Sequence, residues 1–379
     1  MNLAIRDVRH NAPRFALTTL GVAGLLAVVI TMMGIYEGAL SDALRLPRAS
    51  NPDLWVVQPL TKGPFAEPSR IPRDTRDLIR RMPGVAATGA VTFQTLQATT
   101  ANGKPLRLFL QGYEPGRLGG PPAMIAGHGI TQSHYQIVAD ISSGLRIGDQ
   151  LSLGPHSYPY TVVGLTQGMV TSSSDPVAWV TLLDAQAIQF DVAPSLQRRE
   201  KAAGRPPIVT ADINAVLVRL HPGVSKAAVA QDIERWKHLS AVTEQQEEDY
   251  LTVFVISRMQ KQLGMFMGIL IVISAVIIAL IIYTLTMDKL RSIATLKLVG
   301  APDRTIISLI VQQALMLGVS AFALGVALTS AFKGYFPRRV QMEPRDIAIL
   351  FAIVVVMCLL ASILSVRAAV KVDPATALG

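Results

Sequence analysis

The sequence predicts a membrane protein with four transmembrane α-helices and one large α+β domain, of two lobes, between the first and second helix. Half of the 379 residues are hydrophobic and only 16% are charged, whereas soluble domains carry about 25% charged residues. Four stretches contain no Asp, Glu, Lys or Arg, namely 15–36, 262–287, 305–332 and 347–366. Each has at least 20 residues, enough to cross about 30 Å of hydrocarbon at roughly 1.5 Å per residue.

Residues 1–14 are typical of a short amphipathic helix at the membrane surface. Leu3 and Val8 share one helical face while the arginines turn elsewhere, and Pro13 would end this helix and start the next. Basic residues before an apolar run also fit a cleavable secretory signal. The run is about twice as long as a signal core and no Ala-x-Ala site follows it, which favours a retained signal-anchor.

Residues 37–261 form the predicted extracytoplasmic α+β domain. Strand-like pieces with alternating hydrophobicity lie at 53–58, 106–110, 158–163, 177–181 and 213–220. Two helical pieces, 73–82 and 225–238, each accompany a strand near one end of the insert. We therefore expect two lobes, with the membrane-proximal lobe built from both ends of the insert. A helical stalk over 243–261 leads into the second span as a rigid rod.

Basic residues assign the segment between spans two and three, 288–304, to the cytoplasm. Its Lys and Arg residues, together with those before the first span, outweigh the four that lie in the short loop 333–346. That loop is then external, and the N-terminus and the tail 367–379 are cytoplasmic. The sequence therefore predicts a multi-pass membrane protein with both termini in the cytoplasm.

Several kinds of chemistry are missing from the sequence. It has no Gly-x4-Gly-Lys-Ser/Thr loop for phosphates, no His-Glu-x-x-His and no Gly-x-Ser-x-Gly. His128 and His134 lie near Gly-rich turns and are expected to be loop residues rather than metal ligands. The single cysteine, Cys358, lies in an apolar run and is expected to pack there. We expect no catalytic residues, no bound cofactor or metal and no nucleic-acid partner. If the protein performs energy-consuming work, a partner protein must supply the energy.

Several segments resemble the FtsX-like permease family of the MacB type. The most specific is Lys289-Leu-Arg-Ser-Ile-Ala-Thr-Leu-Lys-Leu-Val-Gly-Ala-Pro-Asp-Arg-Thr-Ile306, and both ends of the chain (3–11 and 367–378) and residues 144–154 are similar to that family as well. The resemblance implies a stand-alone permease of an ATP-binding-cassette (ABC) transporter, similar to DevC-type and lipoprotein-releasing permeases. It also implies a second permease copy, identical or different, and a separate dimer of ATPase subunits that carries ATP and Mg. A periplasmic membrane-fusion adaptor, an outer-membrane channel and membrane lipids are the other implied partners, and the implied location is the bacterial inner membrane.

The segment 288–304 is the expected contact with the ATPase. Its apolar residues fall at helical spacing while its basic residues are free to face outward, Gly300 is a fitting helix stop, and Pro302 suits the first turn of the next helix. The coupling residues implied by the resemblance are Lys289, Arg291, Ile293, Leu296, Lys297, Leu298, Gly300 and Pro302. On composition alone, a plain positive-inside loop explains the same residues.

Pairs of glycines four residues apart let helix backbones approach closely. Gly34 and Gly38 end the first span, and Gly264 and Gly268 begin the second. We expect these glycines to form a dimer seam, although packing within one subunit is an equal alternative.

Two functions remain open on the sequence. The first is ATP-powered export or extraction of a lipid, a lipoprotein or another amphiphile, in which the external domain moves. The second is an FtsX-like signalling permease that activates an extracellular cell-wall hydrolase and transports nothing. A neighbouring adaptor gene favours the first function and a neighbouring hydrolase gene favours the second.

Overall fold

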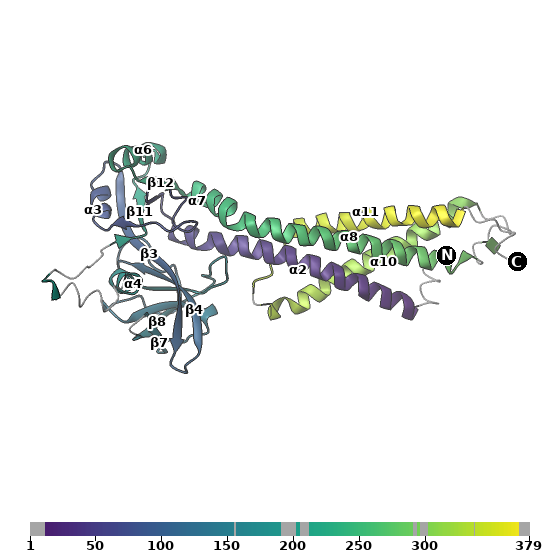
Figure 1. The fold of residues 1–379 in the computed structure, drawn as a ribbon, viewed down its shortest axis with the longest axis horizontal. Helices are drawn as coiled ribbons and strands as arrows, with labels where there is room; N and C mark the ends of the chain where they lie inside the picture. Colours follow the sequence, from purple (N-terminus) through teal and green to yellow (C-terminus); the bar gives the residue numbers. More distant parts are fainter. Residues whose placement is uncertain are drawn as a thin grey trace. The chain divides into compact units, whose positions relative to one another are not determined.

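The computed structural model describes residues 12–154, 157–190, 202–204, 212–290, 294–295, 302–336 and 338–370. The chain divides into two compact units. One comprises Met1–Gly38 and Met259–Gly379, and the other comprises Ala39–Arg258. Figure 1 labels their elements.

The helices are α2 (Ala12–Ser50), α3 (Thr75–Arg80), α4 (Leu182–Gln189), α6 (Lys226–Lys237), α7 (Glu244–Tyr250), α8 (Ser257–Met287), α10 (Asp303–Phe332) and α11 (Pro344–Val370), with short turns η1 (Ile141–Ser143), η2 (Leu251–Ile256) and η3 (Lys333–Tyr335). The strands are β1 (Leu54–Val57), β2 (Ile71–Pro72), β3 (Val85–Thr100), β4 (Pro105–Tyr113), β5 (Met124–Gly127), β6 (Gln136–Asp140), β7 (Gln150–Leu153), β8 (Tyr158–Thr166), β9 (Val177–Thr181), β10 (Asp212–Ile213), β11 (Ala215–Leu220) and β12 (Ser240–Thr243).

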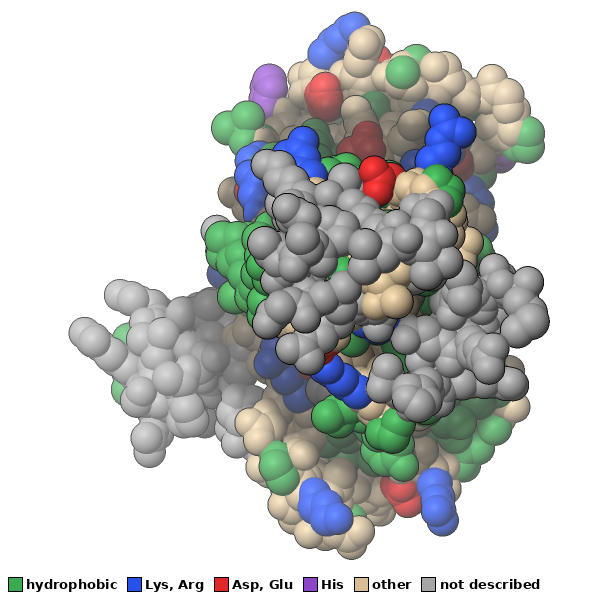
Figure 2. All heavy atoms as spheres, turned by 90° about the vertical axis from the view of Figure 1, so that its right-hand side faces the viewer, with side chains coloured by type: hydrophobic (Ala, Val, Ile, Leu, Met, Phe, Trp, Pro, Cys, Tyr) green, Lys and Arg blue, Asp and Glu red, His purple; other side chains and the backbone are tan. Residues whose placement is uncertain are grey.

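Four helices of the described chain are long and apolar enough to cross a membrane: α2, α8, α10 and α11. They share one apolar core, to which α2 contributes Leu26, α8 Ile278, α10 Ile310 and α11 Val354. Outside this core, apolar side chains stay exposed, as at Val272 on α8, which is 62% exposed. Figure 2, turned by 90° from the view of Figure 1, likewise shows hydrophobic side chains on the surface. Such a surface is stable in hydrocarbon and unfavourable in water.

Cys358 packs against α10, as expected from its apolar neighbours. The residue is 1% exposed, and a Cβ placed on Gly318 would lie 2.3 Å from its Sγ. The missing side chain at Gly318 therefore makes room for the thiol where α10 meets α11.

Helix α2 does not end where the charge-free run ends. It begins at Ala12, so Pro13 lies in its first turn, where a missing N–H costs little. It continues to Ser50, past the expected limit of the span at residue 36, because Ala39, Ala43 and Leu46 keep an apolar face buried. The expected helix over 1–14 falls almost entirely outside the described residues.

One lobe of the domain 39–258 is an antiparallel sheet covered by helices. β1 lies between β11 and β12, and β11 pairs with the first part of β3. Helices α3 and α6 contribute Ile79 and Ile233 to the core on this sheet, and both side chains are fully buried. Ser225 caps α6 by accepting a hydrogen bond from the backbone N–H of Ala228. This lobe combines both ends of the insert, as the sequence predicts.

The other lobe is a closed barrel. The strand pairings run β3–β4–β9–β6–β8–β7 and return from β7 to β3. Closure leaves these strands without a free edge. The barrel encloses a core that includes Leu108, Ile137, Leu151 and Val180.

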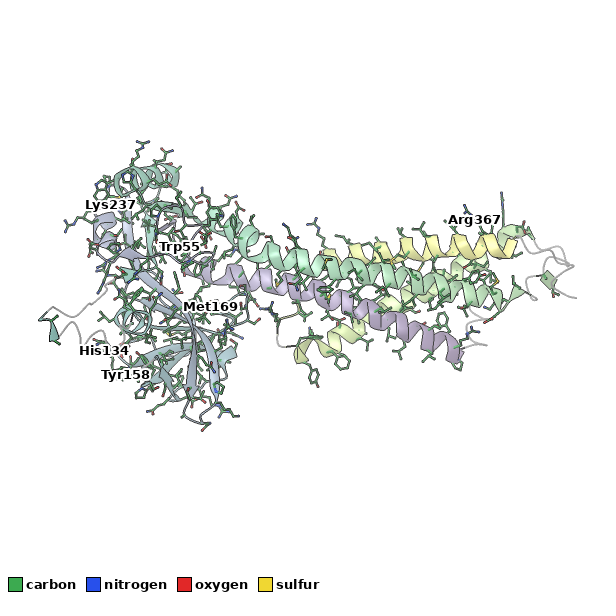
Figure 3. All side chains as sticks on the ribbon, viewed as in Figure 1. Trp55, His134, Tyr158, Met169, Lys237 and Arg367 are labelled. Atoms are coloured by element: carbon green, nitrogen blue, oxygen red, sulfur yellow. The ribbon has the colours of Figure 1, made fainter. Side chains whose placement is uncertain are left out.

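Strand β3 joins the two lobes. It has 16 residues; its first part, up to Val91, pairs with β11, and its later part pairs with β4 and β7. Around the junction lies a core with two buried tryptophans, Trp55 and Trp179, of which Trp55 is labelled in Figure 3. The two lobes are therefore one continuous sheet system.

The predicted stalk is helical but not regular. Thr243 and Gln246 form a capping box at the start of α7. Residues Leu251–Ile256 then form a π-helical turn before α8 begins. Hydroxyl groups bond backbone carbonyls around this turn, as Thr252 does to Glu248 at 2.8 Å, which favours a local change of helix geometry.

Candidate functional site

The predicted ATPase-coupling segment connects α8, which ends at Met287, with α10, which begins at Asp303. Lys289 and Pro302 are described. The other predicted coupling residues lie outside the described residues, and their roles stay predictions: Arg291, Ile293, Leu296, Lys297, Leu298 and Gly300.

Both ends of this segment are anchored to the helices. Asp288, just after α8, forms an ion pair with Arg14 at the start of α2. Ala294 within the segment is 2% exposed. Pro302 stands one residue before α10, at the N-cap rather than in the first turn, with φ −69° and ψ 149°. Its carbonyl accepts a hydrogen bond from the backbone N–H of Thr305 at 2.9 Å. Movement of the segment would therefore be transmitted to α2 and α10.

Gly34 and Gly38 form a notch that holds the loop after α10. The carbonyl of Gly34 accepts a hydrogen bond from the backbone N–H of Gln341 at 2.9 Å. A Cβ on Gly34 would lie 2.5 Å from Val340, and one on Gly38 would lie 2.0 Å from the carbonyl oxygen of Arg339. Close approach here is made within one chain.

Gly264 and Gly268 differ, because nothing lies within 4 Å of a Cβ placed on either. Their face of α8 is open in the single chain. Its use as a contact with a second copy stays a prediction.

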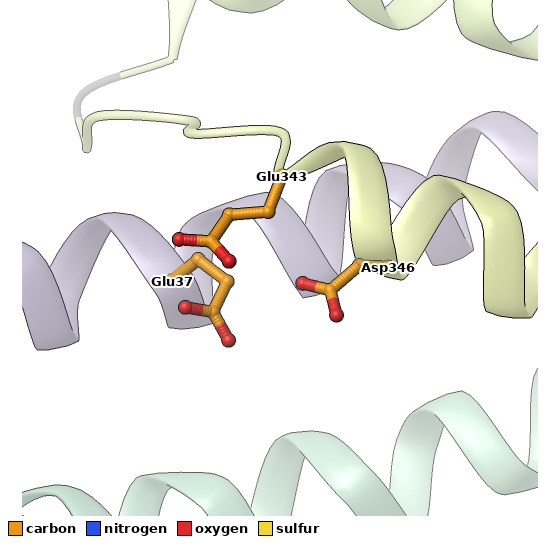
Figure 4. Close-up of side chains that lie close together, drawn as sticks. All are labelled: Glu37, Glu343 and Asp346. Carbon is orange, nitrogen blue, oxygen red and sulfur yellow. The ribbon is translucent and has the colours of Figure 1, made fainter.

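Three carboxylates that the sequence analysis does not single out face one another in the structure. Glu37 of α2, Glu343 and Asp346 offer oxygens within 4.8 Å of one another, as Figure 4 shows. Carboxylate oxygens suit hard cations, but no further His, Cys, Asp or Glu of the described residues joins the group, and we assign the cluster no ion. Only tertiary packing brings residues about 300 positions apart together, so no sequence pattern could have found them.

Within the unit 39–258, the end of α2 is tied to α7. Arg48 and Glu248 form a two-point ion pair, with Nη2 to Oε2 at 3.0 Å. The hydrogen bond from Arg48 holds the pKa of Glu248 below its usual range. Leu46 and Tyr250 pack in the same core as Trp55. The two helical segments are thus fixed to each other where they meet the sheet.

The neighbouring Glu247 is buried. Its exposure is 0%, and burial raises the pKa of its carboxyl to about 8, with a smaller opposing effect of the Phe65 backbone N–H. The loop at Gly63 lies directly on the carboxylate: Gly63 has φ +80°, and a Cβ there would lie 1.7 Å from Oε2. Sequence analysis missed this residue because Glu247 lies in a run of polar and charged residues, 244–249, which gives no sign that one of its carboxylates is buried.

The two histidines considered as metal ligands do not come together on one site. His134 Nδ1 lies 2.6 Å from Oδ1 of Asp184, whereas His128 Nδ1 contacts the carbonyl of Gly129 at 2.7 Å. His134 belongs to an aromatic group with Tyr135 and Tyr158, at the barrel lobe in Figure 3. These contacts support structural roles.

Two family models match the chain. A MacB-like periplasmic core domain matches residues 15–236, and an FtsX-like permease C-terminal domain matches residues 264–374. Together they cover the first apolar helix, most of the domain 39–258 up to residue 236, and nearly all of the three later helices.

Relatives that match over nearly their whole length are described as transporter permeases. An uncharacterized ABC transporter permease of Mycobacterium tuberculosis is 23% identical over 99% of this chain and 98% of its own length. The HrtB permease protein of Staphylococcus haemolyticus, provisionally named as part of a hemin transport system, is 19% identical over 100% of this chain and 99% of its own. The periplasmic region of MacB from Actinobacillus actinomycetemcomitans aligns with 52% of this chain and 91% of that chain, at 10% identity and a TM-score of 0.38.

Proposed function

This chain belongs to the FtsX- and MacB-like family of ABC transporter permeases, and from that membership we propose that it couples ATP hydrolysis by a separate cytoplasmic ATPase to movement of its domain 39–258. The movement exports or extracts a lipid, a lipoprotein or another amphiphile. ABC transporter permeases are the non-catalytic subunits of their transporters, and ATP and Mg would be bound by the partner ATPase.

The order of the matched segments carries this proposal. One apolar helix, a MacB-like domain and three further apolar helices follow one another along the chain. The three last helices bring the segment 288–304 and the tail to the same membrane face as the N-terminus. Because the segment 288–304 is rich in basic residues, we assign this face to the cytoplasm.

The anchored ends of the segment 288–304 support a coupling role. The ion pair between Arg14 and Asp288 connects it to α2, and buried residues such as Ile306 and Ile310 connect it to the helix core. A push from the ATPase on this segment would shift packed helices rather than a free loop.

The far ends of the same helices support transmission to the domain. Helix α2 and the stalk are the two chain connections of the domain, and the ion pair of Arg48 with Glu248 holds them together on its side. The domain would then respond to the two helices as one body.

An amphiphilic substrate fits the absence of charged residues inside the four apolar runs, because ion and proton paths place ionisable groups at membrane depth. The provisional assignment of HrtB to hemin transport agrees with an amphiphilic substrate class.

A second copy of the chain, or a related permease, would complete the transporter. The open face of α8 at Gly264 and Gly268 is the proposed contact, since small residues permit close helix approach. Cysteines at positions 264 and 268, in a chain whose own Cys358 is replaced by alanine, should crosslink two copies in membranes. Failure to crosslink at both positions would exclude this seam.

The coupling role is tested by Leu296→Asp and Leu298→Asp, with Leu298→Met as the size-matched control. The aspartate variants should insert in the membrane but lose both the co-purifying ATPase and transport, because a charge replaces an apolar contact. The methionine variant should keep both. An aspartate variant that retains its ATPase and full transport would refute the coupling assignment.

A further inference from the structure

An apolar groove lies between α2 and the last turns of α10. It encloses about 380 Å³. Its wall is almost wholly apolar and includes Ala27, Val28, Met32, Ile35, Leu328 and Phe332. Val28 and Phe332 are 44% and 54% exposed, so the groove is open on its outer side.

The groove exists because α10 touches α2 closely at one level and then leaves it. A Cβ on Gly325 would lie 3.2 Å from the carbonyl oxygen of Ala23, and the hydroxyl of Thr329 donates to the carbonyl of Ala27 at 3.2 Å. Beyond that contact α10 diverges from α2, as Figure 1 shows, and Phe332 and Phe336 form the far wall.

A basic pocket adjoins the groove. It encloses about 490 Å³, is formed by the loop after α10, and shares Phe336 with the groove. Lys333, Arg338 and Arg339 line it. Among the described residues, no carboxylate lies within ion-pairing distance of Lys333 or Arg338. Arg338 Nη1 donates a weak hydrogen bond to Met259 Sδ at 3.3 Å.

The pocket is held in place, and the nearby acids do not line it. Its loop is fastened to α2 through the hydrogen bond of Gln341 to Gly34. Glu343 and Asp346 line an adjoining cavity next to Gly34, which shares Gln341 and Met342 with the basic pocket, and they line neither the groove nor the basic pocket. Lys333 and Arg338 therefore face an opening that is not lined by a carboxylate of the described residues.

The depth of the two cavities matches one lipid leaflet. Ala27 to Ile35 spans about 12 Å of helix, and one leaflet of hydrocarbon is about 15 Å thick. The groove lies in the apolar run of α2, and the basic pocket lies beside the end of that run. Lys and Arg side chains at this level face the lipid headgroups.

We propose that this chain binds an anionic phospholipid of the surrounding bilayer, with an acyl chain in the groove between α2 and α10 and the phosphate against Lys333 and Arg338. The leaflet is the one on the side where the chain leaves span one for residues 39–258. The site goes beyond the proposed function, because it requires neither the ATPase nor a transported substrate.

Native mass spectrometry of the full-length permease, purified without its ATPase, tests the proposal. The protein should retain phosphatidylglycerol in preference to phosphatidylcholine with the same acyl chains. The double variant Lys333→Gln/Arg338→Gln should bind phosphatidylglycerol roughly 30-fold more weakly. The double variant Lys261→Gln/Arg304→Gln, which removes exposed charges outside the pocket, should bind it normally.

A second pair of variants tests the groove. Val28→Trp fills it and should abolish retention of both lipids, whereas Leu20→Trp, at another exposed position of α2, should not. Equal loss in the two charge variants, unchanged binding in Val28→Trp, or displacement of the lipid by inorganic phosphate alone would overturn the proposal. So would a photo-crosslinker at position 28 that captures a second copy of the chain instead of lipid. When the permease is instead purified together with its ATPase, the Lys333→Gln/Arg338→Gln variant should lose the lipid and still retain the ATPase. This outcome distinguishes the lipid site from the coupling segment.

Discussion

Replacement of the buried Glu247 by glutamine should remove a large pH dependence from the stability of the domain 39–258. The pKa of this carboxyl is about 8 in the folded chain, against an ordinary value of 4.5. Burial therefore favours the protonated form. The folded state is fully stable below pH 4.5 with respect to this group and loses stability as the pH rises toward 8, where the unfolded chain binds fewer protons than the folded one.

The size of the effect follows from the shift. Each pH unit between the two pKa values costs about 1.4 kcal/mol, so the free energy of unfolding should fall by about 4 kcal/mol from pH 5 to pH 8. For a domain of this size that lowers Tm by roughly 10 °C. Glu247→Gln keeps the shape of the side chain without the charge, so it should match the wild type at pH 5 and exceed it at pH 8.

The three tryptophans make the assay specific. Trp55, Trp179 and Trp236 all lie in the domain 39–258, so thermal unfolding of the full chain followed by tryptophan fluorescence reports on that domain. Asp249→Asn, an exposed position on the same helix, removes an equal charge and should leave the slope with pH unchanged. A wild-type Tm that is flat from pH 5 to pH 8, or a glutamine variant with the wild-type slope, would refute the reasoning.

Two further substitutions test the packing. Gly38→Ala places a methyl group 2.0 Å from a backbone oxygen of the loop after α10. It should lower the free energy of unfolding of the helical unit by about 1–3 kcal/mol, measured by circular dichroism. The control Gly21→Ala, with open space around it, should be neutral or slightly stabilising, and equal effects of the two variants would argue against the notch. Trp55→Ala should lower the free energy of unfolding in urea by about 3–5 kcal/mol, because the side chain is 0% exposed. Trp236→Ala, at a side chain that is 51% exposed, should lower it by under about 0.5 kcal/mol. A similarly small effect at position 55 would contradict the proposed core.

Much of the fold can be predicted from the sequence, because local signals decide it. Charge-free runs mark the four apolar helices, since burial of charge in hydrocarbon is costly. The strand-like piece 177–181 is β9, all of whose residues are buried, and the helical piece 225–238 is α6. The end of the span at Glu37 does not mark the end of α2, because a charged residue can stay helical once outside the apolar run.

The remaining features depend on tertiary packing. Closure of the barrel follows from the pairing of β7 with β3, a contact that no local pattern specifies. The burial of Glu247 and the convergence of Glu37 with Glu343 likewise depend on segments far apart in the sequence. The groove beside α10 could not be foreseen either, because apolar runs look alike whether they face lipid, a cavity or another helix.

The side of the membrane on which the segment 288–304 lies decides the account of energy transfer. Cys358 is the single cysteine of the chain and is buried, so a Cys358→Ala background with Ser292→Cys gives one reactive thiol in that segment. A membrane-impermeant maleimide should not label it in intact spheroplasts and should label it after lysis, whereas Ser133→Cys in the domain should be labelled in both. Labelling at position 292 in intact spheroplasts would place the segment outside and contradict coupling to a cytoplasmic ATPase.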